Sequence, residues 1–183
     1  MVEWHVRYLG RSGYFRDEDF LEAAYSEWAR TLAEDELVRR WLRFRAERIR
    51  ALAEELATVV RRLRPGAQVT ADLYPPSGAW LLGQDFKELS GVLDGAKIMV
   101  YVRPFRRSPG RIPYETRLAR DRIGGKTLVL GLASWPPTTP EDIRRQLELA
   151  RGCPIDGVSF YCYGWTPDEN LEAIRTLWSG GER

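Results

Sequence analysis

The sequence predicts an α/β fold in which short parallel strands alternate with helices. Four apolar runs, each about six or seven residues long, are separated by segments with helical periodicity. The runs begin about 27 to 31 residues apart, the spacing typical of repeated strand–helix units. Both faces of each run are apolar, as in a parallel sheet that helices cover.

The predicted strands end where proline or glycine interrupts an apolar run. A further strand is predicted at the N-terminus, which gives five in all. The strands are expected at residues 2–8, 69–74, 96–102, 127–133 and 157–163.

Helices are predicted between these strands. The longest covers 36–63, carries an apolar stripe at spacings of three to four residues, and ends at Pro65-Gly66. Thr139 is a candidate N-cap with Pro140 in the first helical position, and Thr166-Pro167 repeats that start signal. Shorter helical segments are expected at 19–33, 78–93 and 113–123.

Composition predicts one soluble α/β domain over residues 1–183: a first strand at about 2–8, a helical segment at 19–64 and βα units at 68–180. A net charge of +2 gives no reason to expect a nucleic-acid partner. No run of 18 apolar residues and no signal-peptide pattern occur, so we expect no membrane association and a cytoplasmic location. The two cysteines are expected to be free thiols.

Two architectures fit this pattern. A closed eight-stranded barrel needs about 250 residues, so the chain suits the second half of a TIM (βα)8 barrel. The alternative is an open five-stranded, doubly wound sheet of the flavodoxin-like kind. Half a barrel would leave its edge strands unpaired, so a homodimer is expected.

Aromatic residues next to prolines follow the carboxyl ends of the predicted strands, where parallel α/β folds bind ligands. Their rings could stack on the apolar faces of sugars or instead pack beneath the loops. These candidate binding residues are Tyr74, Tyr101, Trp135, Tyr163 and Trp165.

Asp72 lies inside an otherwise apolar strand, where a carboxylate needs a partner. It is either a catalytic or sugar-binding carboxylate or a structural partner for an arginine such as Arg103. Gln84, on the following helical segment, could reach the same edge. Arg103 also begins a basic loop that either binds an anionic group or is simply solvated.

The predicted first strand concentrates polar residues on one face. Alternation places Glu3, His5 and Arg7 together, so Glu3 could act as an acid or nucleophile; the alternative is a solvated face. His5 is the only histidine, which leaves little material for a histidine-based triad or metal site. We expect no metal and no cofactor.

Several motifs resemble one family. Trp41-Leu42-Arg43-Phe44-Arg45 opens the long helix that ends in Arg64-Pro65-Gly66, and Gly83-Gln84-Asp85-Phe86 follows the next strand. With Val6-Arg7-Tyr8 and the final strand from Asp156, these motifs are similar to the later half, about strands four to eight, of glycoside-hydrolase-like (βα)8-barrel proteins. In that family an acid usually stands three residues before the arginine of strand four; here that position is Trp4, and the nearest acid is Glu3.

The resemblance implies acid/base hydrolysis of a glycosidic bond, with Asp72 and Glu3 as the carboxylates. Arg7 and Arg103 would bind substrate or tune the acids, and the strand-end aromatics would stack on a carbohydrate ligand. Two other functions fit the same residues: a non-catalytic sugar-binding module, and an assembly or structural half-barrel protein.

Overall fold

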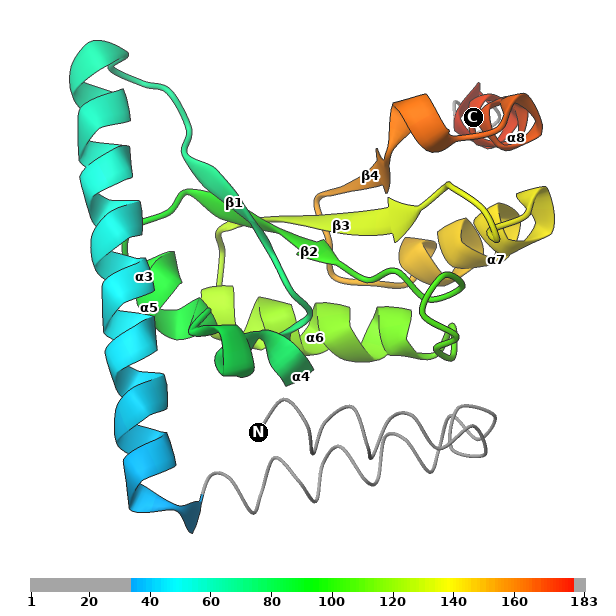
Figure 1. The fold of residues 1–183 in the computed structure, drawn as a ribbon. Coiled ribbons are helices and arrows are strands. Elements are labelled where there is room, and N and C mark those ends of the chain that lie inside the picture. The colour runs from blue at the N-terminus through cyan, green and yellow to red at the C-terminus, as the bar shows by residue number, and fades with distance from the viewer. Residues whose placement is uncertain (1–33, 180–183) are drawn as a thin grey trace. The chain divides into compact units, whose positions relative to one another are not determined.

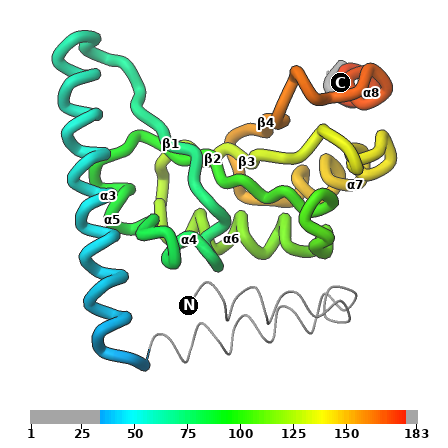
Figure 2. The backbone as a smooth tube through the Cα atoms, in the orientation of Figure 1, coloured from blue at the N-terminus to red at the C-terminus, as the bar shows by residue number. Residues whose placement is uncertain are grey.

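The computed structural model describes residues 34–179. The predicted strand at 2–8 and helix at 19–33 lie outside these residues. The chain forms two compact units, Met1–Trp41 and Leu42–Arg183, and the sheet belongs to the second. In chain order the elements are α3 (Glu36–Leu63), β1 (Thr70–Leu73), α4 (Pro76–Ala79), the 3-10 turn η2 (Trp80–Leu82), α5 (Phe86–Ser90), β2 (Gly95–Met99), α6 (Arg111–Ile123), β3 (Thr127–Ala133), α7 (Pro140–Arg151), β4 (Gly157–Tyr161), the 3-10 turn η3 (Tyr163–Trp165) and α8 (Asp168–Ser179) (Figures 1 and 2).

The four strands form one parallel sheet in the order β1-β2-β3-β4, which confirms the predicted α/β fold with alternating strands and helices. The bounds of β3 are those predicted, and the other three strands are shorter than predicted. A doubly wound sheet requires a reversal of strand order. Over residues 34–179 the strand order follows the chain without reversal.

Local capping signals explain where α7 begins. Thr139 and Asp142 form a capping box, in which the Thr139 hydroxyl accepts from the Asp142 N–H and the Asp142 carboxylate accepts from the Thr139 N–H at 3.0 Å. Pro140 occupies the first turn as predicted. The matching prediction at Thr166 is wrong in detail: α8 begins at Asp168, and the Thr166 hydroxyl bonds to Ser134 and to the Cys162 carbonyl instead.

The predicted helical segment 78–93 is three short pieces. Gly83 breaks it with a φ of 74°, a left-handed conformation that glycine adopts without strain. A side chain at Gly83 would also lie 2.9 Å from Arg45 Cβ, so this glycine lets α3 approach closely. Asp85 then caps α5 by accepting from two backbone N–H groups.

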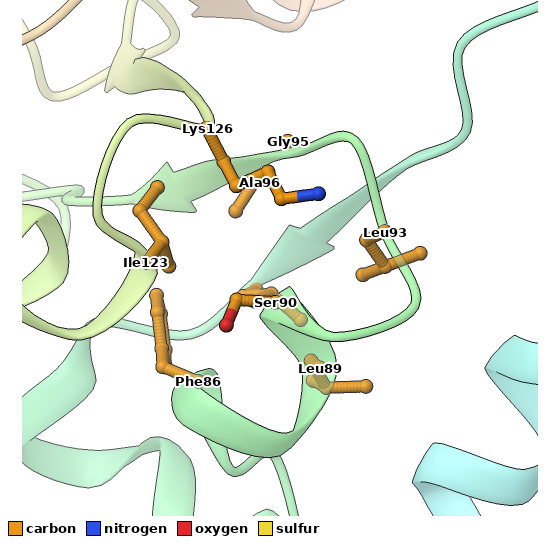
Figure 3. Close-up of a pocket in the computed structure, with 9 residues that line it drawn as sticks. Phe86, Leu89, Ser90, Leu93, Gly95, Ala96, Ile123 and Lys126 are labelled. Atoms are coloured by element: carbon orange, nitrogen blue, oxygen red, sulfur yellow. The ribbon is translucent and has the colours of Figure 1, made fainter.

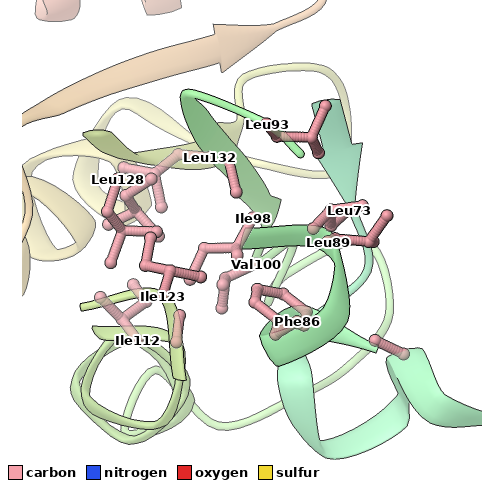
Figure 4. Packing of buried hydrophobic residues seen from close by; sticks show 14 of the residues in the cluster. Leu73, Phe86, Leu89, Leu93, Ile98, Val100, Ile112, Ile123, Leu128 and Leu132 are labelled. Atoms are coloured by element: carbon pink, nitrogen blue, oxygen red, sulfur yellow. The ribbon is translucent and has the colours of Figure 1, made fainter. Parts of the chain in front are cut away.

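One face of the sheet carries the hydrophobic core. Leu73, Ile98 and Leu130 point to this helix-covered face, where side chains of α5, α6 and α7 pack on them. Ile98 and Leu130 are fully buried. Figure 4 shows the strand side chains meeting Phe86 and Ile112 from the helices. The opposite face, which we call the open face, carries Asp72, Lys97, Met99 and Tyr161, whose side chains are half-buried or exposed.

α3 has the bounds that its periodicity predicted, but most of its apolar stripe is exposed. Ala57 is its only buried residue, and Ala53 also packs against the core. The helix is held beside the sheet by polar contacts: Arg61 donates to the Val92 carbonyl, and Arg50 pairs with Glu88 at 3.6 Å. The exposed apolar residues from residue 42 on, here called the α3 stripe, are Phe44, Ile49, Leu52, Leu56, Val59, Val60 and Leu63.

Aspartates just before β2 and β4 tie neighbouring strands together. The Asp94 carboxylate accepts from the Val69 N–H at 2.8 Å and from Arg61 at 3.1 Å. Two strands later, the Asp156 carboxylate accepts from the Leu128 N–H at 2.7 Å and from Arg120 at 2.8 Å.

These contacts form a repeated clamp that joins a helix, the strand after it and the next strand. The Val69 N–H and Arg61 hold the pKa of Asp94 below its usual value of 3.8. Arg120 and the Leu128 N–H do the same for Asp156. Both carboxyl groups are therefore ionised at neutral pH.

A second polar device lies in the packing between α4 and α6. Glu115 is fully buried and accepts from the Ser77 N–H at 3.0 Å and from the Ser77 hydroxyl at 2.5 Å. Arg111 pairs with the same carboxylate and also donates to the Ser77 hydroxyl. This network joins α4 to the first turns of α6.

Among the described residues, none of the helices combines the length and the apolar character needed to cross a bilayer.

We predict that Asp156→Asn destabilises the fold by about 1 kcal/mol at neutral pH, a modest figure because the side chain is half-exposed. Since the folded-state pKa is lowered, the wild type keeps this stabilisation above about pH 4 and loses it as the pH falls further. Urea unfolding at neutral and acidic pH measures the difference. Asp121→Asn, on the exposed side of α6, is the control; an equal, pH-independent effect of both variants would contradict the clamp.

We predict that Glu115→Ala lowers the free energy of unfolding by about 3 kcal/mol, because it leaves Arg111 without its buried carboxylate. Glu115→Gln keeps the shape and one acceptor, so its loss should be smaller. Urea denaturation of both variants measures this order, and an alanine variant as stable as wild type would show that the network contributes nothing.

Candidate functional site

Five aromatic rings gather at the carboxyl ends of β2, β3 and β4. Tyr101 lies 5.0 Å from Trp135, edge to face, and 5.9 Å from Tyr161, stacked. Trp135 meets Tyr161 at 5.7 Å, and Tyr161 meets Trp165 at 6.3 Å, both edge to face. Phe105 stacks on Tyr101 at 6.5 Å. We call this set of five residues the aromatic cluster.

The cluster has a supported base and an accessible surface. Tyr101 and Trp135 are half-buried, whereas Tyr161, Phe105 and Trp165 are 43%, 60% and 64% exposed. The inner rings hold one another in place by the geometry that aromatic quadrupoles favour. The outer rings remain free to contact a ligand.

Strand alternation explains why three of these rings meet. Lys97 and Met99 of β2 point to the same face, and Tyr101, two residues beyond the end of β2, continues that row. Ala133 pairs with Tyr161 across β3 and β4, so Tyr161 belongs to that face as well. Trp135, two residues beyond Ala133, continues the row. The cluster therefore lies at the carboxyl end of the open face.

A buried hydrogen-bond network fixes the two loops that carry Trp135 and Trp165. The Ser134 N–H donates to the Tyr161 carbonyl at 3.0 Å, and the Ser134 hydroxyl lies 2.6 Å from the Thr166 hydroxyl. Asn170, fully buried on α8, donates to the carbonyls of Ser134 and Thr138, both at 2.8 Å. These bonds lock the loop after β3 onto the loop after β4.

Asp72 lies on the open face and is paired with a lysine. Its carboxylate is 2.7 Å from Lys97 Nζ, and the two residues are register partners on β1 and β2. Asp72 is 57% exposed and Lys97 21% exposed. Asp72 thus lies within β1 as predicted but faces away from the core, and its partner is Lys97, whereas the suggested arginine partner, Arg103, pairs with Asp142.

The Lys97 side chain passes close to Gly131 on β3, although its register partner there is Val129. A Cβ at Gly131 would be 3.6 Å from the Lys97 side-chain carbons and 3.1 Å from the Ile98 carbonyl. A Cβ at this position would make only ordinary van der Waals contact with the lysine stem, so the close approach that favours glycine here is to the Ile98 carbonyl. The ammonium group then reaches Asp72 at the edge of the open face.

Electrostatics connect this ion pair to the aromatic cluster. Burial raises the pKa of Tyr101 to about 12, and the nearby charges of Asp72, Tyr161 and Cys162 add to the shift. Tyr101 therefore keeps its proton at neutral pH and presents a hydroxyl that can donate. Beside the aromatic cluster there are thus one hydrogen-bond acceptor, the Asp72 carboxylate, and two donors, the Lys97 ammonium and the Tyr101 hydroxyl.

The other predicted site residues have varied positions. Gln84 does reach the end of β1, where its side-chain oxygen accepts from the Tyr74 N–H at 2.8 Å. Tyr74 and Tyr163 are 51% and 81% exposed, near the ends of β1 and β4. Arg103 pairs with Asp142 at the start of α7, at 3.5 Å. Glu3 and Arg7 lie outside the described residues.

Sequence reasoning missed five residues of this site: Lys97, Phe105, Tyr161, Ser134 and Asn170. Alternation along 157–163 places Tyr161 on the same face as Ser159, and that signal could have found it. Lys97 becomes notable only once the register opposes it to Asp72. Asn170 carried no local signal, because its partners lie in a distant loop.

Other features are less suited to chemistry. Among residues 34–179, no group of three or more metal-ligating side chains comes together. Both cysteines are free and half-buried. A small apolar hollow lies at the opposite end of the sheet, near the start of β2, lined by residues such as Phe86, Leu89 and Ile123 (Figure 3). Its lining offers few polar groups to orient a ligand.

No protein-family model matches the chain, and no curated protein matches it.

We predict that Asp72→Asn lowers the pKa of Tyr101 from about 12, because the variant removes a nearby negative charge and leaves Lys97 unneutralised. NMR of ring-labelled tyrosine against pH measures the titration of this one residue. Asp121→Asn should leave it unchanged. An unaltered Tyr101 titration in Asp72→Asn would place the carboxylate too far away to act with the cluster.

Proposed function

We propose that the protein binds carbohydrate at the carboxyl end of its sheet, on the aromatic cluster. One observation carries the proposal. The aromatic cluster has half-buried inner rings and exposed outer rings, and it lies beside the Asp72–Lys97 ion pair on the open face. Sugars present an apolar face of C–H groups, which stacks on aromatic rings, and an edge of hydroxyls, which needs donors and acceptors.

The polar groups fit this role. The Asp72 carboxylate can accept two hydroxyl hydrogen bonds, and the Lys97 ammonium can donate to ring or hydroxyl oxygens. The protonated Tyr101 hydroxyl adds a further donor. A few polar groups converging beside an apolar wall are typical of small-ligand sites.

We propose further that Asp72 is a catalytic carboxylate for hydrolysis of the glycosidic bond. This reaction uses two carboxyl groups, one on each side of the bond. Asp72 would be one of them, since it stands at the strand end beside the rings. Glu3, the second predicted carboxylate, lies outside the described residues. Binding therefore has more support than hydrolysis.

The architecture fits a half-barrel, which we propose as the finer description of the fold. Four parallel strands in chain order, with helices packed on one face, are what consecutive βα units of a barrel produce. The polar open face would then line the barrel interior. The cluster would lie at the barrel mouth, the face where such barrels carry their sites.

We predict that a soluble oligosaccharide quenches or shifts the intrinsic tryptophan fluorescence, and that Trp165→Ala weakens its binding about tenfold through the loss of one stacking ring. Titration with a panel of neutral and acidic oligosaccharides measures the affinity. Tyr114→Ala removes an exposed ring on α6 and is the matched control. Failure of every sugar to bind, or equal weakening by both variants, would overturn the proposal.

Asp72→Asn separates hydrolysis from binding within the same experiment. If Asp72 is catalytic, a bound oligosaccharide that wild type cleaves will stay intact with the variant, while its affinity changes little. Reducing-end release measures cleavage. Binding without cleavage by the wild type would leave a sugar-binding module and reject the catalytic role of Asp72.

A further inference from the structure

Two apolar surfaces of the second unit are only partly covered: one is a sheet face that lacks a helix, and the other is a helix face that lacks a sheet. On the helix-covered face, Leu130 and Leu132 of β3 are fully buried, but their register partners Val158 and Phe160 on β4 are only half-buried. β4 thus lacks part of its helical cover. At the other edge of the sheet, the α3 stripe is a helical surface that lacks a sheet to cover.

The contacts of α3 show at which edge of the sheet its uncovered stripe lies. α3 contacts segments that flank β1: Arg45 donates to the Leu81 carbonyl in η2, after β1, and Arg61 reaches Asp94, whose carboxylate also accepts from the Val69 N–H just before β1. Only the alanine side, Ala53 and Ala57, packs on the core. The α3 stripe is left uncovered by the sheet at this edge.

The α3 stripe is large enough to form an interface. Its seven side chains are between 36% and 72% exposed. If a fully exposed large apolar side chain contributes about 200 Å², they expose on the order of 700 Å². A typical monomer's largest apolar patch is about 300–600 Å², and a stable interface buries about 800 Å² per partner.

Charge favours α8 of another copy as the neighbour of α3. From residue 42 on, α3 carries six arginines against three glutamates. The α8 helix carries Asp168, Glu169 and Glu172 against Arg175 alone. α8 follows β4 directly, so a β4 placed beside β1 would bring an acidic helix next to a basic one.

We propose that a second copy of this chain packs against the β1 edge, so that β4 of each copy lies parallel to β1 of the other. Four strands from each copy then give eight, the number that closes a (βα)8 barrel, and the two-fold symmetry makes both junctions identical. The α3 stripe of each copy covers the half-buried face of the partner's β4. This removes both unpaired sheet edges of the described strands.

The closed ring would complete the site as well as the fold. The open faces of both copies turn inward, and both aromatic clusters stand at the same mouth. Asp72 of the partner subunit then supplies a second carboxylate, as the proposed hydrolysis requires. The inference rests on the proposed half-barrel, but its test does not need a sugar.

The test is the mass of the full chain by light scattering, with variants of α3. We expect a dimer for wild type and for Ala51→Arg, an exposed position off the stripe. Leu56→Arg places a charge in the stripe and should raise the dimer dissociation constant roughly a hundredfold. Circular dichroism and thermal unfolding of Leu56→Arg at low concentration check that the monomer still folds.

A wild-type monomer at all concentrations would overturn the inference, and would mean that the chain itself covers the stripe. A dimer that Leu56→Arg leaves intact would overturn it too, because another surface would form the interface. The proposed attraction between the acidic α8 and the basic α3 can be tested independently. Glu172→Arg, on α8, should weaken the dimer more than Glu148→Arg, which changes an exposed glutamate of α7. A monomer that still binds sugar would reject the dimer and keep the proposed function.

Discussion

The register of the parallel sheet is the constraint on which the rest of the structure depends. Parallel strands have no tight turn to align them, since each is joined to the next by a long crossover. Here Asp94 and Asp156 do part of this work at the amino ends: each holds a backbone N–H at the start of the preceding strand and an arginine of the helix before it. Their lowered pKa values show that folded-state contacts favour the charged form.

The register that is fixed at the amino ends of the strands determines which side chains meet at their carboxyl ends. With the strands in this register, Asp72 opposes Lys97, and Ala133 opposes Tyr161. A slip of one residue would turn Asp72 and Tyr161 toward the helices and the core leucines toward the open face. The Ser134–Thr166–Asn170 network completes the alignment by holding the two loops beyond the strands. The candidate site is thus a consequence of register and of loop fixation together.

The sequence predicted those features whose causes are local. The capping signals at Thr139 and Pro140 predicted the start of α7, and Pro65-Gly66 predicted the end of α3. The apolar runs located all four described strands. Features caused by distant residues were harder to predict. Thr166 resembles an N-cap, but its hydroxyl bonds to Ser134, which lies far away in sequence. The partner of Asp72 follows from the strand register, so Arg103 was a wrong candidate and Lys97 was overlooked.

Periodicity also shows which side chains share a face, but not what covers that face. The α3 stripe follows the expected helical spacing, yet Ala57 alone is buried. The rings at the strand ends were predicted one by one from their neighbouring prolines. Tyr101 and Trp135 contact each other directly, and Trp165 joins them through Tyr161, which was not among the predicted residues. The sequence thus indicated the carboxyl edge of the sheet as the candidate site, but it could not show which side chains contact one another there.

The proposed function requires that three segments at the strand ends, 99–105, 133–137 and 161–166, act as one ligand surface. Hydrogen–deuterium exchange with and without a saturating oligosaccharide tests this most directly, because it locates protection along the whole chain. We expect all three segments to gain protection together, while the amino ends of the strands stay unchanged. Protection confined to another region, or in one segment without the others, would contradict the proposed function.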